Sequence, residues 1–213
     1  MMLKHTPFPL LPYRFLLWGL ISYIVIETLG VLVLQYMGDL QEQTVIMSMR
    51  LLELIAFIIF IHKFNALSNL GLNMPKQDSL YVFLNIAAIC LMGAALLYVL
   101  QPKWFAYITL PAWLHGISGL LLMVVLAPIV EELIFRGLLY RMLRERWGIF
   151  ISVAASAAFF SLVHHGMLLS PQLIGGIIFA LAYEWSRSLW VSIALHMGAN
   201  AAVYELVVLG LAA

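Results

Sequence analysis

Charged residues are scarce in this chain of 213 residues, at 10% of the sequence against about 25% in soluble domains. Hydrophobic residues make up 64%, and the mean hydropathy is +1.03. This composition excludes an ordinary water-soluble domain and indicates a membrane protein. The net charge of +1 offers none of the excess positive charge that nucleic-acid binding requires, so we expect no nucleic-acid partner.

Cysteine is nearly absent too, because Cys90 is the single one and lies in an apolar run. One cysteine supports neither a disulfide framework within the chain nor a cysteine-based metal site. Linkers, internal repeats and low-complexity stretches are also missing from the sequence. We therefore expect one transmembrane domain over residues 1–213.

Long apolar runs are what the sequence has in abundance. A helix needs roughly 20 apolar residues to cross the hydrocarbon of a membrane. Seven stretches meet or approach this length: 15–37, 45–64, 79–101, 114–140, 149–168, 172–186 and 189–211. The sequence thus predicts an all-α bundle of about seven spans, in contact with membrane lipid. The short stretch 172–186 contains two adjacent glycines, so we expect it to be tilted, broken or partly re-entrant.

Lysine and arginine outside these runs favour one side of the membrane. If the N-terminus is cytoplasmic, the inner segments hold Lys4, Arg14, Lys63, Lys76, Arg141, Arg144, Arg146 and Arg187, while Lys103 lies outside. Cytoplasmic loops of membrane proteins are rich in these residues. The sequence therefore predicts a multi-pass protein of the cell membrane with a cytoplasmic N-terminus.

Polar residues inside the apolar runs indicate chemistry, because an ionisable group in hydrocarbon is costly and tends to persist where it has a function. Three strings contain them: Glu131-Glu132-Leu133-Ile134-Phe135-Arg136, Phe160-Ser161-Leu162-Val163-His164 and His196-Met197-Gly198-Ala199-Asn200. The helical rise allows side chains from these three spans to meet at comparable depths.

The two adjacent glutamates face different neighbours, since consecutive helical positions are about 100° apart. Glu132 and Arg136 are four residues apart in the order that favours an ion pair, so we expect them to pair. Glu131 is then available for proton transfer. Pro128 lies just upstream and removes a backbone hydrogen bond, which is expected to kink or widen the helix beside Glu131.

These residue types suffice for a hydrolase. Glu131 can activate a water molecule, with His164 sharing the proton or orienting the water. His196 and Asn200 lie one helical turn apart and can both donate hydrogen bonds to a developing oxyanion. Attack of water on an amide carbonyl then needs no serine or cysteine nucleophile.

The same motifs resemble the intramembrane CAAX-protease and bacteriocin-processing family, which includes the type II CAAX prenyl endopeptidases. That family's pattern is Glu-Glu-x-x-x-Arg, Phe-x-x-x-His and His-x-x-x-Asn, matched here between residues 128 and 200. The resemblance implies an endopeptidase of membrane-associated, leader or C-terminal-tag peptides, with these residues in its site: Glu131, His164, His196 and Asn200 as catalytic groups, and Glu132, Arg136 and Phe160 as their support. The domain then divides into scaffold spans at 1–110 and catalytic spans at 111–213.

Metal use and partners are less constrained by the sequence. A set of one glutamate and two histidines can bind zinc, and Glu131, His164 and His196 would be its ligands. The spacing is not that of the His-Glu-x-x-His zinc helix, so we favour a mechanism without a cofactor and keep zinc as the alternative. The expected partner is a peptide or protein substrate that enters the bundle. The oligomeric state is not predicted.

Two other functions use the same residues differently. A non-catalytic immunity or scaffold protein of this fold would bind a peptide without cleaving it. A transporter would relay protons, but transporters typically contain internal repeats, which this sequence lacks. In the scaffold spans, Arg50 and Glu53 are expected to form an ion pair, and lining a water-filled cavity is one hypothesis for Glu27.

Overall fold

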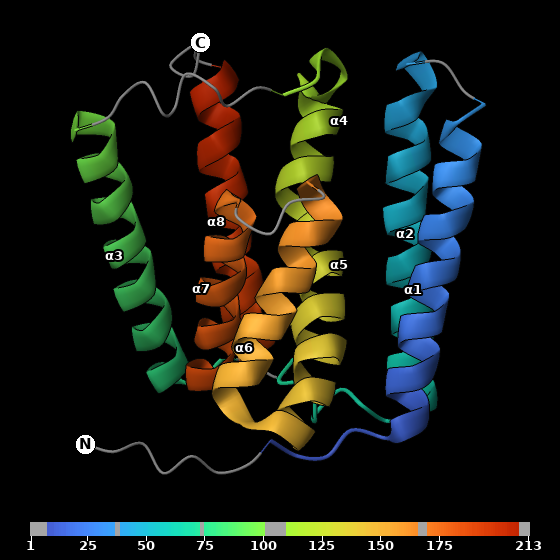
Figure 1. Cartoon of the computed structure of the whole chain (residues 1–213), viewed down its shortest axis with the longest axis vertical. Coiled ribbons are helices and arrows are strands. Elements are labelled where there is room, and N and C mark those ends of the chain that lie inside the picture. Colours follow the sequence, from blue (N-terminus) through green and yellow to red (C-terminus); the bar gives the residue numbers. More distant parts are fainter. Residues whose placement is uncertain (1–7, 37–38, 73–74, 101–109, 166–169, 209–213) are drawn as a thin grey trace.

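The computed structural model describes residues 8–36, 39–72, 75–100, 110–165 and 170–208. Within these ranges the chain is almost entirely helical and contains no strand. The helices run side by side along one axis (Figure 1). The predicted all-α bundle is therefore confirmed.

Long helices make up the first half of the bundle, and shorter, more irregular ones make up the second. The first half consists of α1 (Tyr13–Leu34), α2 (Asp39–Lys63) and α3 (Gln77–Leu100). The second half consists of the short helix η2 (Ala112–Leu114), α4 (Ile117–Leu120), the π-helix η3 (Leu121–Leu126), α5 (Ala127–Glu132), the π-helix η4 (Leu133–Tyr140), α6 (Arg141–His165), α7 (Pro171–Ser186) and α8 (Leu189–Val208).

The chain reverses direction inside α6. Gly148 has φ 75° and ψ −177°, a conformation that breaks the helix and that a residue with a side chain rarely adopts. Residues from α4 to the start of α6 therefore form one long rod, and the rest of α6 returns antiparallel to it (Figure 1). This return brings the Phe160–His164 string beside α5.

The described residues contain about five to six spans, where the sequence predicts about seven with an error of one. Five helices of the described residues are long and apolar enough to cross a membrane: Tyr13–Leu34, Glu42–Lys63, Gln77–Ala94, Ile117–His164 and Leu189–Val208. The fourth has 48 residues and contains the reversal at Gly148, so the count is about five to six rather than seven.

The difference comes from α7, which is one unbroken helix of 16 residues and so falls short of the roughly 20 needed to span. Figure 1 shows α6 and α7 ending part-way along their neighbours. Packing rather than length holds α7 in place. A Cβ atom on its Gly176 would come within 2.9 Å of the Ala157 Cα atom of α6, so the two backbones approach each other closely.

Basic residues gather at one end of the bundle, as predicted. Arg14 lies at the start of α1, Lys63 ends α2, and Arg187 lies between α7 and α8, all at the end of the bundle where α1 begins (Figure 1). Lys4 and Lys103 lie outside the described residues. Which side of the membrane this basic end faces stays a prediction.

The basic end is tied together by the carboxylate of Glu184, which is fully buried. It accepts hydrogen bonds from the Tyr140 hydroxyl at 2.6 Å, from Arg144 at 3.1 Å and from Arg187 at 3.0 Å. Burying a carboxylate is tolerated when charged donors surround it in this way. The network joins η4, α6 and α7 at the basic end of the bundle.

Candidate active site

Glu131 stands at the centre of the residues that the sequence predicts for the site. Its Oε2 atom lies 3.3 Å from Nε2 of His164 and 3.7 Å from Nε2 of His196. These side chains come from α5, α6 and α8, so three separate helices deliver them to one point. The predicted convergence is present, whereas the catalytic roles of the residues stay a prediction.

The hydrogen bonds of His164 define where its proton lies. Its Nδ1 atom is 2.8 Å from the carbonyl oxygen of Phe160, and a carbonyl can only accept, so Nδ1 carries a hydrogen. Its Nε2 atom faces the Glu131 carboxylate, and a contact between these two atoms requires a proton on one of them. The Glu131–His164 pair therefore shares one proton, which suits it to acid–base chemistry.

His196 bridges the two adjacent glutamates. Its Nδ1 atom lies 2.9 Å from Oε1 of Glu132, while its Nε2 atom points toward Glu131. Glu132 is fully buried and also accepts a hydrogen bond from Ser192 at 2.5 Å. A carboxylate at Nδ1 fixes the orientation and tautomer of an imidazole ring. Sequence reasoning missed this contact, although its available signals were the second glutamate beside Glu131 and Ser192, one turn before His196.

The predicted ion pair of Glu132 and Arg136 is confirmed at 2.7 Å, with both side chains fully buried. Arg136 also donates to the carbonyl oxygen of Gly176 at 3.0 Å, which ties η4 to α7. Its guanidinium lies over the ring of Phe160, 4.8 Å from the centroid. The charge of Arg136 is thus balanced by a carboxylate, a carbonyl and an aromatic face, the conditions under which a buried cation is tolerated.

Phe160 packs against both histidines, in line with its predicted supporting place. Its ring centroid lies 4.4 Å from that of His164 and 5.6 Å from that of His196. Phe179 of α7 stacks on the other side of His196 at 4.6 Å, with an angle of 19° between the rings. These rigid rings limit the rotamers of both histidines and hold their Nε2 atoms toward Glu131.

The widening expected at Pro128 is present, because the π-helix η3 directly precedes α5. In a π-helix each N–H bonds to the carbonyl five residues earlier, so a residue at position 128 would bond to Met123. Proline has no N–H to offer. Asn200 donates its side-chain N–H to the Met123 carbonyl instead, at 2.9 Å. Asn200 therefore satisfies the backbone beside the site, and its oxyanion role stays a prediction.

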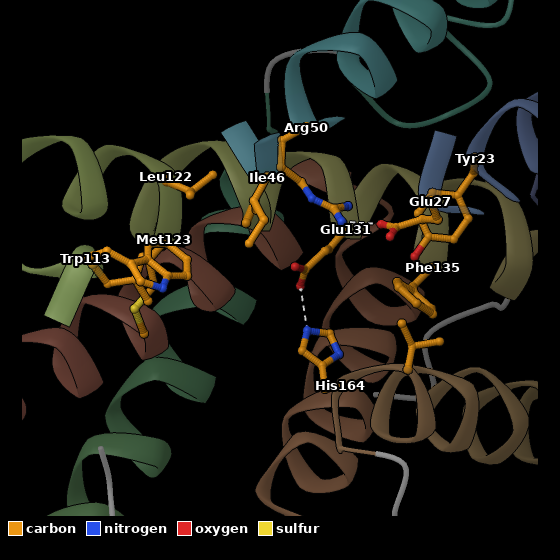
Figure 2. Close-up of a pocket in the computed structure, with 13 residues that line it drawn as sticks. Tyr23, Glu27, Ile46, Arg50, Trp113, Leu122, Met123, Glu131, Phe135 and His164 are labelled. Atoms are coloured by element: carbon orange, nitrogen blue, oxygen red, sulfur yellow. Dashed lines mark hydrogen bonds and ion pairs between the residues drawn. The ribbon is translucent and has the colours of Figure 1, made fainter. Parts of the chain in front are cut away.

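A cavity of about 330 Å³ opens beside Glu131 and His164 (Figure 2). Their side chains are 14% and 28% exposed, while that of His196 is 5% exposed and lies behind them. The opposite wall includes Glu27 of α1 and Arg50 of α2, so the cavity hypothesis for Glu27 agrees with the structure. The Glu131–His164 pair therefore borders this cavity.

The described residues contain no group of three His, Cys, Asp or Glu side chains arranged to hold a metal ion. Both histidines are oriented by acceptors at Nδ1, and both Nε2 atoms face one carboxylate oxygen. The mechanism without a cofactor stays a prediction, with zinc as the alternative, and removal of metal ions from the purified protein tests it.

Comparison with known proteins supports the resemblance in the second half of the chain. Residues 111–202 match a family described as type II CAAX prenyl endopeptidase Rce1-like. An 83-residue segment is 31% identical to the membrane-embedded CAAX protease MroQ of Staphylococcus aureus (strain USA300). Residues 111–202 are therefore similar to proteases of the CAAX family. This range contains every residue predicted for the site.

The extent of the similarity is limited on both sides. The aligned segment covers 36% of this chain and 34% of MroQ, so the chain matches about a third of that relative's length. No solved structure matches the chain. The helices α1 to α3 lie outside the family range, which begins where the predicted catalytic spans 111–213 begin. The division at residue 110 itself stays a prediction.

Proposed function

We propose that this chain is an intramembrane endopeptidase of the CAAX-protease type. The observation that carries the proposal is the 3.3 Å contact between Glu131 and His164 in the wall of a cavity among apolar helices. A carboxylate and an imidazole that share a proton form an acid–base pair. Their placement within the family range 111–202 gives that pair a hydrolytic context.

In the proposed reaction, Glu131 removes a proton from a water molecule in the cavity as the water oxygen attacks a peptide carbonyl. The C–O bond forms, and the carbonyl oxygen becomes an oxyanion. His164 then delivers a proton to the amide nitrogen as the C–N bond breaks, which releases a carboxylic acid and an amine. The proton removed from water thus ends on the leaving amine, and the pair returns to its starting state.

The oxyanion is assigned to His196 and Asn200. We propose that Nε2 of His196 donates to the oxyanion, while the Glu132 carboxylate at Nδ1 holds the ring in this orientation. Asn200 has two amide N–H groups, of which one donates to Met123. The second is the one that we propose for the oxyanion.

The proposed substrates are membrane-associated peptides, such as leader peptides or C-terminal tags, entering the bundle in an extended conformation. An extended backbone fits a narrow cavity and presents its carbonyl to Glu131. The cavity is lined partly by apolar and aromatic side chains, which suits a peptide already at the membrane. We further propose residence in the cell membrane with the basic end and the N-terminus in the cytoplasm, from the distribution of lysine and arginine.

The test compares peptide termini in membranes of host cells that carry wild type, Glu131→Gln or Glu145→Gln at matched expression. Glutamine keeps the shape of glutamate but cannot act as a base. Glu145 is an exposed carboxylate at the basic end and serves as the control. We expect new termini with wild type and Glu145→Gln that are absent with Glu131→Gln. Identical termini in all three, with the host phenotype intact, would overturn the enzyme and favour the peptide-binding alternative.

A further inference from the structure

A second cavity, of about 380 Å³, lies between α3, α7 and α8. We call it the α3–α8 groove, and its walls include Ala87 and Cys90 of α3, Phe179 of α7 and Gly198 of α8. Among the described residues that line it, Cys90 is the only one with a polar side-chain atom. The volume falls within the roughly 300–1,000 Å³ of sites that bind small molecules. The groove therefore has the size of a ligand site and an almost purely apolar lining.

The groove lies away from the basic end of the bundle. Both α3 and α8 start at that end, and the lining residues fall within 83–94 of α3 and 194–206 of α8. On α7 they fall within 175–179, in the half of the helix that is farther from the basic end. Because α7 is short and begins part-way along its neighbours (Figure 1), it closes only part of the space between α3 and α8.

The surroundings of the groove are membrane lipid. Both α3 and α8 are long and apolar enough to cross a membrane. Only 6% of the most apolar window of α3 is buried inside the structure, so most of this helix faces outward. On the α8 side, Gly198 and Ala202 are exposed within the groove. A molecule that covers them from outside comes from the hydrocarbon layer, which consists of acyl chains.

The apolar lining determines what can fill the groove. A buried water molecule needs about two to four polar partners, which these side chains do not supply. An empty space is also unfavourable, since the atoms around it lose their dispersion contacts. An acyl chain is flexible and apolar, and it leaves one hydrocarbon environment for another, so packing alone can favour its binding.

Phe179 connects the groove with the proposed active site. Its side chain lines the groove and is 6% exposed. Its ring also stacks on His196, with ring centroids 4.6 Å apart and an angle of 19° between the planes. A molecule in the groove therefore packs against the ring that limits the rotamers of His196.

We infer that the α3–α8 groove binds an acyl chain of a membrane phospholipid from the leaflet opposite the basic end. The chain completes the packing around Phe179 that the short helix α7 leaves open. Its headgroup stays at the membrane surface, because the groove offers no polar partners for it. This lipid site does not depend on whether the protein cleaves peptides.

Photo-cross-linking in a bilayer tests the inference. The full chain is placed in nanodiscs in which a small share of the phospholipid carries a diazirine on an acyl chain, and adducts are located by mass spectrometry after irradiation. We expect adducts on the groove residues Cys90 and Ala202, beside those on outward residues such as Leu29 of α1, which is 57% exposed. The measured quantity is the adduct yield in the groove divided by the yield at Leu29.

Two matched pairs of variants fill the groove or spare it. A Cβ atom on Gly198 or on Gly93 meets nothing within 4 Å, but only Gly198 lines the groove. Gly198→Leu should therefore lower the yield ratio roughly fivefold or more, because no room is left for the chain, and Gly93→Leu should leave it unchanged. Ala87→Phe, inside the groove, and Ala88→Phe, outside it, should give the same contrast from α3. The second pair decides the matter if Gly198→Leu does not fold.

Two results would overturn the inference. If the wild-type protein carries no adduct in the groove while Leu29 is labelled, the groove is closed to phospholipid, filled by the protein itself or by another molecule. If the groove-filling variants keep the same yield ratio as their controls, the adducts come from lipid passing over the surface. Because the yield ratio is measured without any substrate, failure of the proposed function leaves this test unaffected.

Discussion

The two halves of the bundle differ in how much of each helix is buried. In the long helical stretch Ile117–His164 and in α8, 44% and 33% of the most apolar window is buried inside the structure. The corresponding shares for α1, α2 and α3 are 17%, 22% and 6%. The second half is thus the more deeply buried part, whereas the first half mainly faces outward and contributes a charged wall to the cavity. Chemistry that needs fixed geometry lies in the half that is packed well enough to fix it.

Among substitutions that test the packing of the second half, Glu132→Ala is expected to have the largest effect on stability. This change leaves Arg136 as an unpaired buried charge and removes the acceptors of His196 and Ser192. We expect a loss of about 3–5 kcal/mol in the free energy of unfolding, together with loss of activity. Chemical unfolding in detergent measures the first. A loss below about 1 kcal/mol would show that the buried pair is not what holds this half together.

A smaller effect is expected where α6 and α7 touch. Gly176→Ala places a Cβ atom within 2.9 Å of the Ala157 backbone, and overpacking of this kind costs about 1–3 kcal/mol. Gly93→Ala in α3 is the matched control, since a Cβ atom there meets nothing within 4 Å. In thermal unfolding, Gly176→Ala should have a lower unfolding temperature than wild type, and Gly93→Ala should have an unchanged or slightly higher one. Equal effects in the two variants would contradict the difference in packing.

Ser192→Ala is a milder test of the contacts by which Glu132 holds His196. It removes the hydroxyl that donates to Glu132 at 2.5 Å and leaves the Arg136 and His196 contacts in place. The expected loss in unfolding free energy is about 1 kcal/mol, the usual net worth of one hydrogen bond. Peptide cleavage should fall several-fold through kcat. An unchanged kcat would show that Glu132 orients His196 without help from Ser192.

Removal of metal ions should have the smallest effect of all. A zinc chelator should leave cleavage by the purified chain unchanged, because the proposed mechanism uses Glu131 and His164 without a cofactor. Elemental analysis of the purified protein gives the independent measurement. Stoichiometric zinc, with activity lost on chelation and recovered on adding zinc, would contradict the mechanism without a cofactor.

Local contacts were the part of the site that the sequence predicted well. The Glu132–Arg136 and Arg50–Glu53 pairs follow from positions one helical turn apart, and both form. The meeting of Glu131, His164 and His196 also followed from spacing along antiparallel helices. In each case the regular geometry of a helix determines the position of each side chain along its axis to within one turn.

Contacts that depend on how helices rotate against one another were not predictable in the same way. The bond from Asn200 to Met123 depends on the π-turn before Pro128, and that from His196 to Glu132 on the rotation of α8 against α5. The position of Arg50 beside Glu131 joins residues 81 apart in the chain and depends on the packing of α1 and α2. The span count is lower than seven because an apolar run of adequate composition, in α7, is shorter than a membrane crossing.

The most direct test of the central claim is hydrolysis by the purified chain in water labelled with oxygen-18. Wild type and Glu131→Gln, each in nanodiscs, are incubated with membrane peptides from a host that lacks the protein, and the new C-termini are analysed by mass spectrometry. If the Glu131–His164 pair hydrolyses peptide bonds, wild type produces C-termini that contain oxygen-18 and Glu131→Gln produces none. Equal yields of labelled termini from the two proteins would contradict the account.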